Sequence, residues 1–600
     1  MTNAPPAADA SLTEHLRHWA RHRPQQRAFS HVHFPDMTSA GLHRTLGWRA
    51  LDARARAVAD RLVTLAAPGD RAALVMPQGL DYAAAFLGCL YARVIAVPLF
   101  GPQLPGHEGR LTAVLGDCEP ACLLADAATV TSVEAFVLDH GLPVVPVVPV
   151  DQLPVQRFAF DEAETSAAPD DIAYLQYTSG STRAPAGVMI SHANVVANAR
   201  QAIDALITDP GTSTTVGWLP LFHDMGLVLS IAAPVVGGFP SVLMDPVAFL
   251  ENPVRWLRLL GSYQGTISAA PNFAYDYCVA RIDAAALDEL RLDRVRVLIN
   301  GSEPVRPGTI DRFHTTFAAA GLDPATHCPA YGLAEATVFV TADGSATMPT
   351  TVLCDTDALA EGRIETTAIQ GAETTSVPGA EATSDPGAEA TSPPEAEDTS
   401  QPDVTSLVSC GAPVGQELQI VGPDGEVLPA DHVGEIRLRG PNIGRGYWKR
   451  ADQPFCDPEG RLRTGDLGAL HEGRLLVTGR LKDVIIVDGR NHYPQDIEET
   501  VQTAVDLVRR DRLTAFGVSR ADGTGEELVV VAEHRRDTVP TAEATRDVER
   551  TVRAAVSARH GLRLGTLLLV PPGSVPRTSS GKVARAASRA RYLDGGFGPR

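Results

Sequence analysis

The stretch "YTSGSTRAPAGVMISH" runs from Tyr177 to His192 and follows the apolar run "DIAYLQ". Its first half is rich in small and hydroxylated residues, and Gly180 and Gly187 let the backbone approach a ligand closely. Hydroxyl groups and free backbone N–H groups together suit a polyanion such as a phosphate chain. The stretch is not a Walker phosphate loop, because no Gly-Lys-Ser/Thr sequence follows at the required spacing. A plain serine- and glycine-rich turn is the alternative explanation for these residues taken alone.

The composition sets limits on the function. The chain has 600 residues, of which 44% are hydrophobic and 21% charged, so it can bury a large core. Its formal net charge of -20 argues against a nucleic-acid-binding surface. The cysteines are scattered, without a histidine cluster nearby, and the polar N-terminus lacks an apolar signal segment. We therefore expect a cytoplasmic protein without a zinc site or a disulfide framework.

The segment Met225–Met244 is uncharged and about as long as a membrane span. Its prolines and glycines instead predict a buried helix, a turn and a strand. No integral membrane contact is expected.

The order of apolar segments predicts the fold class. "DYAAAFLGCLYA" (81–92) reads as a helix, whereas "VIAVPL" (94–99), "GTISAAP" (265–271) and "VRVLING" (295–301) read as buried strands. This alternation predicts α/β layers with largely parallel sheets. Later segments such as "ALHEGRLLVTG" predict β-hairpins in a compact sheet or barrel. We thus predict an α/β chain, with layered α/β subdomains and a β-hairpin or barrel subdomain in residues 1–480 and a small α+β domain in residues 481–600.

A repeat interrupts this pattern. From Gly371 the chain reads GAETTSVP, GAEATSDP, GAEATSPP and EAEDTSQP, with a proline closing each octad. These octads contain almost no large apolar residue, so they cannot bury enough surface to offset the entropy of ordering. We predict that residues 366–405 are disordered and dispensable for chemistry.

Four further motifs, taken together with the opening stretch, indicate a family. They are "YGLAEATV" (331–338), "RTGDLG" (463–468), "GRLKDVIIVDGRNHYPQDIE" (479–498) and "PRTSSGKVAR" (576–585). In this order and at these separations, they resemble the signature set of the adenylate-forming superfamily, which includes acyl-CoA synthetases, luciferases and nonribosomal adenylation domains. The resemblance covers most of the chain apart from the octads.

Other stretches narrow the resemblance. "GWLPLFHDMGL" (217–227) and "DGRNHYPQDIE" (488–498) are most similar to fatty acyl-AMP ligases, which adenylate a fatty acid and pass it to the phosphopantetheine arm of an acyl carrier protein. Many superfamily members have Gly and Lys where this chain has Arg183 and Ala186, and fatty acyl-AMP ligases resemble this chain in both departures. The resemblance implies that Arg183 supplies counter-charge to pyrophosphate, although a solvated loop charge is an open alternative. It implies that the loop itself contacts the phosphates of ATP through Thr178, Ser179, Gly180, Ser181 and Thr182.

The resemblance also assigns the nucleotide site. It places both ribose hydroxyls on Asp466, with Arg480 as an additional donor, and the adenine beside Tyr331 and Gly332. It assigns Glu335, together with Thr178, to Mg²⁺, because a carboxylate near a triphosphate needs a cation between them. A turn aspartate, a core tyrosine and a surface glutamate are the alternatives. The stretch implied on the other side of the adenine comprises Gly301, Ser302, Glu303 and Pro304.

Lysine is rare in this chain. Lys and Arg total 52, yet only Lys449, Lys482 and Lys582 are lysine. Adenylation brings a carboxylate against the α-phosphate, and a compact ammonium stabilises the charge that gathers there. Lys582, in the "TSSGK" loop, is the predicted catalytic cation, with a plain surface lysine as the alternative. This role requires the C-terminal domain to close over the rest. The resemblance makes Lys482 the hinge about which that mobile domain swings after adenylation.

The remaining assignments concern the acid and the acceptor. The resemblance places His223 at the carboxylate end of the acyl pocket, with a core histidine as the alternative, and "APNFAY" (270–275) along that pocket. Residues 341–365 lie where fatty acyl-AMP ligases carry an insertion that restrains the small domain and disfavours free CoA.

The predicted activity is ATP- and Mg²⁺-dependent adenylation of a fatty acid. Transfer to the thiol of a separate acyl carrier protein, in polyketide, nonribosomal peptide or lipid biosynthesis, would follow. An acyl-CoA synthetase and a catalytically silent acyl-adenylate-binding module are the competing hypotheses.

Overall fold

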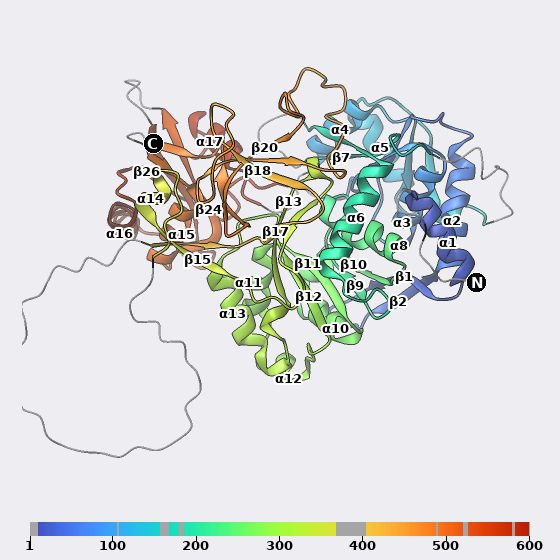
Figure 1. The fold of residues 1–600 in the computed structure, drawn as a ribbon, viewed down its shortest axis with the longest axis horizontal. Helices are drawn as coiled ribbons and strands as arrows, with labels where there is room; N and C mark the ends of the chain where they lie inside the picture. Colours follow the sequence, from blue (N-terminus) through green and yellow to red (C-terminus); the bar gives the residue numbers. More distant parts are fainter. Residues whose placement is uncertain are drawn as a thin grey trace, which may run out of the picture.

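The structure is a computed structural model that describes residues 6, 10–104, 107–155, 167–178, 185–367, 404–487, 490–519, 526–578 and 582–598. In Figure 1 the blue and green segments form the larger part of the molecule, and the orange and red segments of the C-terminal domain lie beside it. Helices cover largely parallel sheets in the larger part, as the alternation of apolar segments predicts. The predicted fold class is confirmed.

One sheet carries the phosphate-loop candidate. Its strand order is β6-β5-β3-β4-β7-β8, and its pairs are parallel except β7 with β8. β4 is buried at every position, as expected for a strand covered on both faces. The strands are β3 Arg71–Leu74, β4 Ile95–Pro98, β5 Cys122–Ala125, β6 Val147–Pro149, β7 Ile172–Tyr177 and β8 Gly187–Ser191.

A second sheet has the order β17-β14-β13-β12-β11-β9-β10-β1-β2. Its central strands run parallel, whereas β2, β14 and β17 pair antiparallel at the two edges. Its strands are β1 Arg27–His33, β2 Leu42–Gly47, β9 Thr214–Gly217, β10 Ser241–Met244, β11 Thr266–Ala270, β12 Val295–Asn300, β13 His327–Gly332, β14 Phe339–Ala342 and β17 Ala412–Pro413.

The predicted hairpins form an antiparallel sheet in the order β18-β19-β20-β21. The turn between β20 and β21 has positive φ at both Glu472 (50°) and Gly473 (76°), which matches the right-handed twist of paired strands. The strands are β18 Glu417–Val421, β19 Gly434–Arg439, β20 Leu462–His471 and β21 Arg474–Arg480.

The predicted insertion folds into an antiparallel pair. β15 (Thr351–Asp355) pairs with β16 (Val404–Val408), and α14 (Thr356–Ala360) follows β15. Residues 368–403, which include the octads at 371–402, lie outside the described residues. The two edges of the predicted disordered range, 366–405, are ordered. Thr366 forms a β-bridge with Cys354, and β16 begins at Val404.

The C-terminal domain contains the hairpin β22 (Ile485–Val487) and β23 (Arg490–His492) and the mixed sheet β24-β25-β26. α15 and α16 pack together beside this sheet around a common apolar core. A final helix, α17 (Arg585–Leu593), was not predicted from the sequence. The other elements are α15 Pro494–Ala504, β24 Val508–Ser519, β25 Glu526–His534, α16 Ala542–His560 and β26 Leu564–Val570.

The segment of membrane-span length is broken as predicted. It comprises α7 (Asp224–Leu227), the π-helical turn η2 (Val228–Ala232), α8 (Ala233–Gly237) and strand β10. Across the described ranges, no helix has the length and apolar character needed to cross a bilayer. The remaining helices are α1 Leu12–His22, α2 Trp48–Leu62, α3 Leu80–Tyr91, α4 Glu108–Cys118, α5 Val130–Asp139, α6 His192–Leu206, α9 Pro246–Glu251, α10 Val254–Ser262, α11 Asn272–Arg281, α12 Ala284–Glu289 and α13 Pro307–Phe317, with short 3-10 turns between several of them.

Candidate active site

The opening stretch forms the connection between β7 and β8. The Thr178 N–H donates to the carbonyl of Ala186 (3.1 Å), so the two ends of the loop meet. Ser179, Gly180, Ser181, Thr182 and Arg183 lie outside the described residues, and their predicted phosphate contacts stay predictions.

Two arginines hold the ends of this loop. Arg110, on α4, donates from Nη2 to the carbonyls of Tyr177 and Thr178, both at 3.3 Å. Arg450 donates to the carbonyl of Pro185 (2.8 Å). Burial lowers the pKa of Arg110 to about 10, which leaves it a cation at neutral pH. Sequence reasoning missed both residues, because neither lies in a recognisable motif.

Tyr331, Asp466 and Arg480 form a connected group although they come from three strands. The Tyr331 hydroxyl donates to Asp466 Oδ2 (2.8 Å), and Arg480 Nε lies 2.9 Å from Asp466 Oδ1. The charge of Asp466 is the main cause that raises the pKa of Arg480. Each carboxylate oxygen can accept more than one hydrogen bond, so Asp466 retains capacity for ribose hydroxyls.

Gly332 ends β13 at a point of close backbone approach. A Cβ at this position would lie 1.7 Å from the carbonyl oxygen of Val338, so only glycine fits. The glycine therefore lets the chain turn directly from Tyr331 into the segment that carries Glu335.

Glu335 is partly buried in a short 3-10 turn, Ala334–Ala336. Burial raises the pKa of its carboxyl, and the Tyr447 hydroxyl, which donates to Oε1 (2.8 Å), partly offsets this shift. A divalent cation would stabilise the ionised form, so this hard oxygen donor fits Mg²⁺. Within the described ranges, no group of three or more His, Cys, Asp or Glu could hold a metal ion. Mg²⁺ bound by one or two protein oxygens and substrate phosphates requires no such group.

Lys582 comes from the C-terminal domain. Its N–H donates to Thr578 Oγ1 (3.1 Å), and its carbonyl accepts from the Thr578 N–H (2.8 Å), so it sits at the base of a tight loop. Burial lowers the pKa of its ammonium, whereas the charges of Glu303, Asp224 and Asp466 raise it. All three carboxylates belong to the N-terminal region. Two of them, Glu303 and Asp466, are predicted site residues, and their charges act on this ammonium.

The stretch predicted beside the adenine begins where β12 ends. Gly301 lies close to the carbonyl of Ala330, Ser302 has a φ of 70°, and Glu303 accepts the Phe273 N–H at 2.7 Å. Burial raises the pKa of Glu303. The charge of Glu303 also acts on Lys582, an interaction that the sequence did not indicate. Pro304 follows directly.

His223 immediately precedes α7. Burial, assisted by the charges of Arg110 and Lys582, lowers its pKa to about 3, so its imidazole is neutral near pH 7. Its Nε2 makes no hydrogen bond within the described part of the chain. A neutral imidazole with one unpaired nitrogen can orient a carboxyl group, as predicted for this residue.

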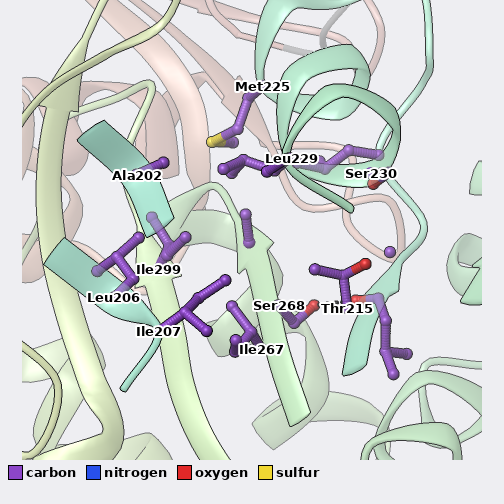
Figure 2. Close-up of a pocket in the computed structure, with 15 residues that line it drawn as sticks. Ala202, Leu206, Ile207, Thr215, Met225, Leu229, Ser230, Ile267, Ser268 and Ile299 are labelled. Carbon is purple, nitrogen blue, oxygen red and sulfur yellow. Dashed lines mark hydrogen bonds between the residues drawn. The ribbon is translucent and has the colours of Figure 1, made fainter. Parts of the chain in front are cut away.

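An apolar pocket is lined by Met225, two residues after this histidine. Figure 2 shows Met225 and Leu229 on one side of it, with Ile267 and Ile299 from neighbouring strands and Leu206 and Ile207 at the end of α6. The cavity volume is about 20 Å³, room for about one water molecule. Residues 267–269 of β11 line it. Residues 270–275 are not among the described lining of this pocket, and their predicted place along the acyl site stays a prediction.

A larger cavity of about 660 Å³ lies between the two parts of the molecule. Thr178, Tyr447 and Arg450 line it from the N-terminal region, and Arg585 and Arg589 line it from α17. The predicted hinge, Lys482, is on its wall and lies in an exposed turn directly after β21.

Comparison with known proteins decides the family. The family model described as "AMP-binding enzyme" matches residues 16–364 and 373–448. The chain is an AMP-binding enzyme. A second family model, described as the AMP domain of Disco-interacting protein 2-like proteins, matches residues 482–597 of this AMP-binding enzyme.

Individual relatives indicate which type of AMP-binding enzyme this chain is. The long-chain-fatty-acid–AMP ligase FadD26 of Mycobacterium marinum is 39% identical to the AMP-binding enzyme, and the match covers 99% of both chains. A solved structure from work on fatty acyl-adenylate ligases of E. coli and L. pneumophila has a TM-score of 0.81 and 31% identity, covering 98% of this chain and 99% of that one. The putative fatty-acid–CoA ligase fadD21 of Mycobacterium bovis is 38% identical, covering 98% of both chains. The AMP-binding enzyme is therefore of the fatty acyl-AMP ligase type, as the sequence motifs predict.

Proposed function

We propose that the enzyme uses ATP and Mg²⁺ to adenylate a fatty acid and then transfers the acyl group to the phosphopantetheine thiol of a separate acyl carrier protein. One observation carries this proposal. The charge of Asp466 acts on the ammonium of Lys582 from the C-terminal domain, and Asp466 contacts Tyr331 and Arg480 in the nucleotide-site candidate. This is the arrangement that adenylation requires.

In the first step, a carboxylate oxygen of the fatty acid attacks the α-phosphorus of ATP. The bond from this phosphorus to the bridging oxygen breaks, and pyrophosphate leaves. The Lys582 ammonium stabilises the negative charge that gathers at the α-phosphate, because the interaction strengthens as the two anions approach. Neutral His223 orients the carboxylate at the mouth of the apolar pocket.

Glu335 and Thr178 would hold Mg²⁺, which screens the charge of the leaving pyrophosphate when bound. The Tyr447 hydroxyl fixes one oxygen of the Glu335 carboxylate and leaves the other for the metal. Arg110 and Arg450 keep the two ends of the phosphate loop in place from opposite sides.

In the second step, the thiol of the carrier attacks the acyl carbon and AMP leaves. This requires Lys582 to withdraw, and we propose that the C-terminal domain turns about Lys482 to allow it. Lys482 itself is exposed and lies in the turn between β21 and the C-terminal hairpin, a position where a change in φ and ψ would turn the domain.

The insertion supports a carrier protein rather than free CoA as the acceptor. Asp357 of α14 accepts a hydrogen bond from Arg490 of the C-terminal domain (2.8 Å), and Cys354 and Leu359 belong to the same apolar cluster as Tyr493. These contacts join the insertion to the domain that must move. We propose that they restrain its motion and so disfavour the small diffusing acceptor.

A direct test incubates the enzyme with ATP, Mg²⁺ and a panel of fatty acids, and identifies adenylates and acylated acceptors by mass spectrometry. Acyl-adenylate formation followed by loading of a phosphopantetheinylated carrier, with little acyl-CoA, is the expected result. Robust acyl-CoA formation would favour the CoA ligase instead. Absence of acid-dependent ATP–pyrophosphate exchange would indicate a silent binding module.

A further inference from the structure

Arg306 connects the two parts of the molecule across their interface. It is the residue before α13, three positions after Glu303. Its Nη1 lies 2.5 Å from Asp511 Oδ1, and its Nε lies 3.5 Å from Glu499 Oε2. Both carboxylates belong to the C-terminal domain, Glu499 on α15 and Asp511 in β24.

The backbone of β24 is irregular at the point where it presents Asp511. The register with β25 shifts between Val508, which faces His534, and Leu513, which faces Ala532, so the β24 segment contains extra residues. Asp511 itself has a φ of 56°, an unfavourable value for a residue with a side chain. Its N–H donates to Gln502 Oε1 (3.1 Å), which holds this conformation. Bulges commonly redirect a side chain, and here the bulge directs a carboxylate across the interface.

The charges around Arg306 link this contact to the catalytic lysine. Burial alone would lower the pKa of the Arg306 guanidinium, but Asp511 and Glu499 raise it well above its usual range. The charge of Glu303 acts on Arg306 and on Lys582. The same partly buried carboxylate thus interacts with the guanidinium of the interdomain ion pairs and with the ammonium of Lys582.

We propose that Arg306 is a positioning residue that holds the C-terminal domain, through Asp511 and Glu499, in the arrangement that presents Lys582 for adenylation. The inference rests on the proposed two-step function, because an arrangement used for one step must be released for the other. Arg306 then favours the first step and is not needed for the second.

The test measures the two steps separately in the full-length enzyme. Arg306→Ala should lower fatty-acid-dependent ATP–pyrophosphate exchange about tenfold, because fewer molecules have the competent arrangement. Transfer from chemically prepared acyl-adenylate to a phosphopantetheinylated carrier should keep at least the parent's rate. Arg312→Ala is the matched control, because Arg312 lies on α13, the helix that follows Arg306, and pairs with Asp276 inside the N-terminal region (2.6 Å). It should change neither step.

The double variant Arg306→Asp with Asp511→Arg should recover part of the lost exchange rate, whereas each single change should not. Equal losses in both steps, or an Arg306→Ala variant that exchanges pyrophosphate at the parent's rate, would overturn the proposal. If Arg306→Ala fails to fold, Asp511→Asn combined with Glu499→Gln tests the same ion pairs from the other side.

A readout independent of activity separates this proposal from the proposed function. Spin labels would be attached at Asp288→Cys on α12 and Glu543→Cys on α16 to report the interdomain distance. Cys456→Ser removes the natural cysteine that is not fully buried. The parent should give a narrow distribution and Arg306→Ala a broader one. Identical distributions would refute the positioning role even if adenylation is confirmed. If the distance distribution broadens in Arg306→Ala but the parent enzyme forms no adenylate, only the proposed function is refuted.

Discussion

The two halves of the active site are prepared differently. In the N-terminal region, hydrogen bonds or ion pairs connect Tyr331 with Asp466, Asp466 with Arg480, and Tyr447 with Glu335 before any substrate binds. Within the described residues, no side-chain hydrogen bond or ion pair fixes the ammonium of Lys582, which is positioned by its loop and by surrounding charge. Under the proposed function, one half is thus preorganised for the nucleotide, and the other completes its contacts only when the reacting phosphate is present.

The largest effect is expected at the unfixed half. Lys582→Ala should lower the rate of adenylation at least about a hundredfold with little change in the KM for ATP, since the ammonium acts mainly in the transition state. Fatty-acid-dependent ATP–pyrophosphate exchange measures this. Lys449→Ala is the matched control, because Lys449 forms a surface ion pair with Glu119. A Lys582→Ala enzyme that is folded and fully active would refute the assignment of Lys582 as the cation that completes the site.

At the preorganised half, Glu335→Gln should raise the Mg²⁺ concentration needed for half-maximal adenylation about tenfold, because a neutral amide is a weaker ligand. A Mg²⁺ titration of exchange measures the change, and excess Mg²⁺ should restore part of the rate. Removing the metal from the parent with EDTA should abolish exchange. An unchanged titration midpoint would exclude Glu335 as the metal ligand.

A smaller effect is expected where only one hydrogen bond is lost. Tyr331→Phe should raise the KM for ATP about threefold and leave kcat nearly unchanged, because Asp466 is still held by Arg480. Tyr82→Phe provides the control, since its hydroxyl donates to the carbonyl of Leu99 in the core. It should lower thermal stability without altering the KM. A large fall in kcat for Tyr331→Phe would show that the tyrosine does more than position Asp466.

The smallest effect concerns pH. Because burial lowers the pKa of Lys582 below its ordinary value of 10.5, the ammonium loses its charge at a lower pH than a surface lysine. Adenylation should therefore fall as pH rises through that lowered pKa. Lys582→Arg, slower overall, should keep its rate to higher pH because the guanidinium stays charged. Parallel pH profiles for the two enzymes would assign the alkaline decline to another group.

The motif residues were predictable because their chemistry is local. Gly332 needs its close backbone approach, and Lys582 stands out in a chain that otherwise uses arginine for its cations. Arg110, Tyr447 and Arg450 were not predictable in the same way. Each acts through a contact with a residue distant in sequence, and no spacing rule marks such a pair.

Other misses have equally physical causes. In α17 only Ser588 and Tyr592 are buried, so the helix leaves little hydrophobic periodicity in the sequence. The strain at Asp511 follows from the pairing of β24 with β25, which the sequence does not specify.

The base of the insertion fixes where the octads leave and re-enter the fold. The Thr367 N–H donates to the carbonyl of Leu353, and Val404 is paired with Asp355, so both ends are anchored to one strand. The sequence predicts a disordered loop for the octads, and for such a loop with fixed ends each doubling of its length costs only about 0.6 kcal/mol of closure entropy. The number of octads can therefore drift in evolution almost without penalty, while the chemistry beside it stays under constraint.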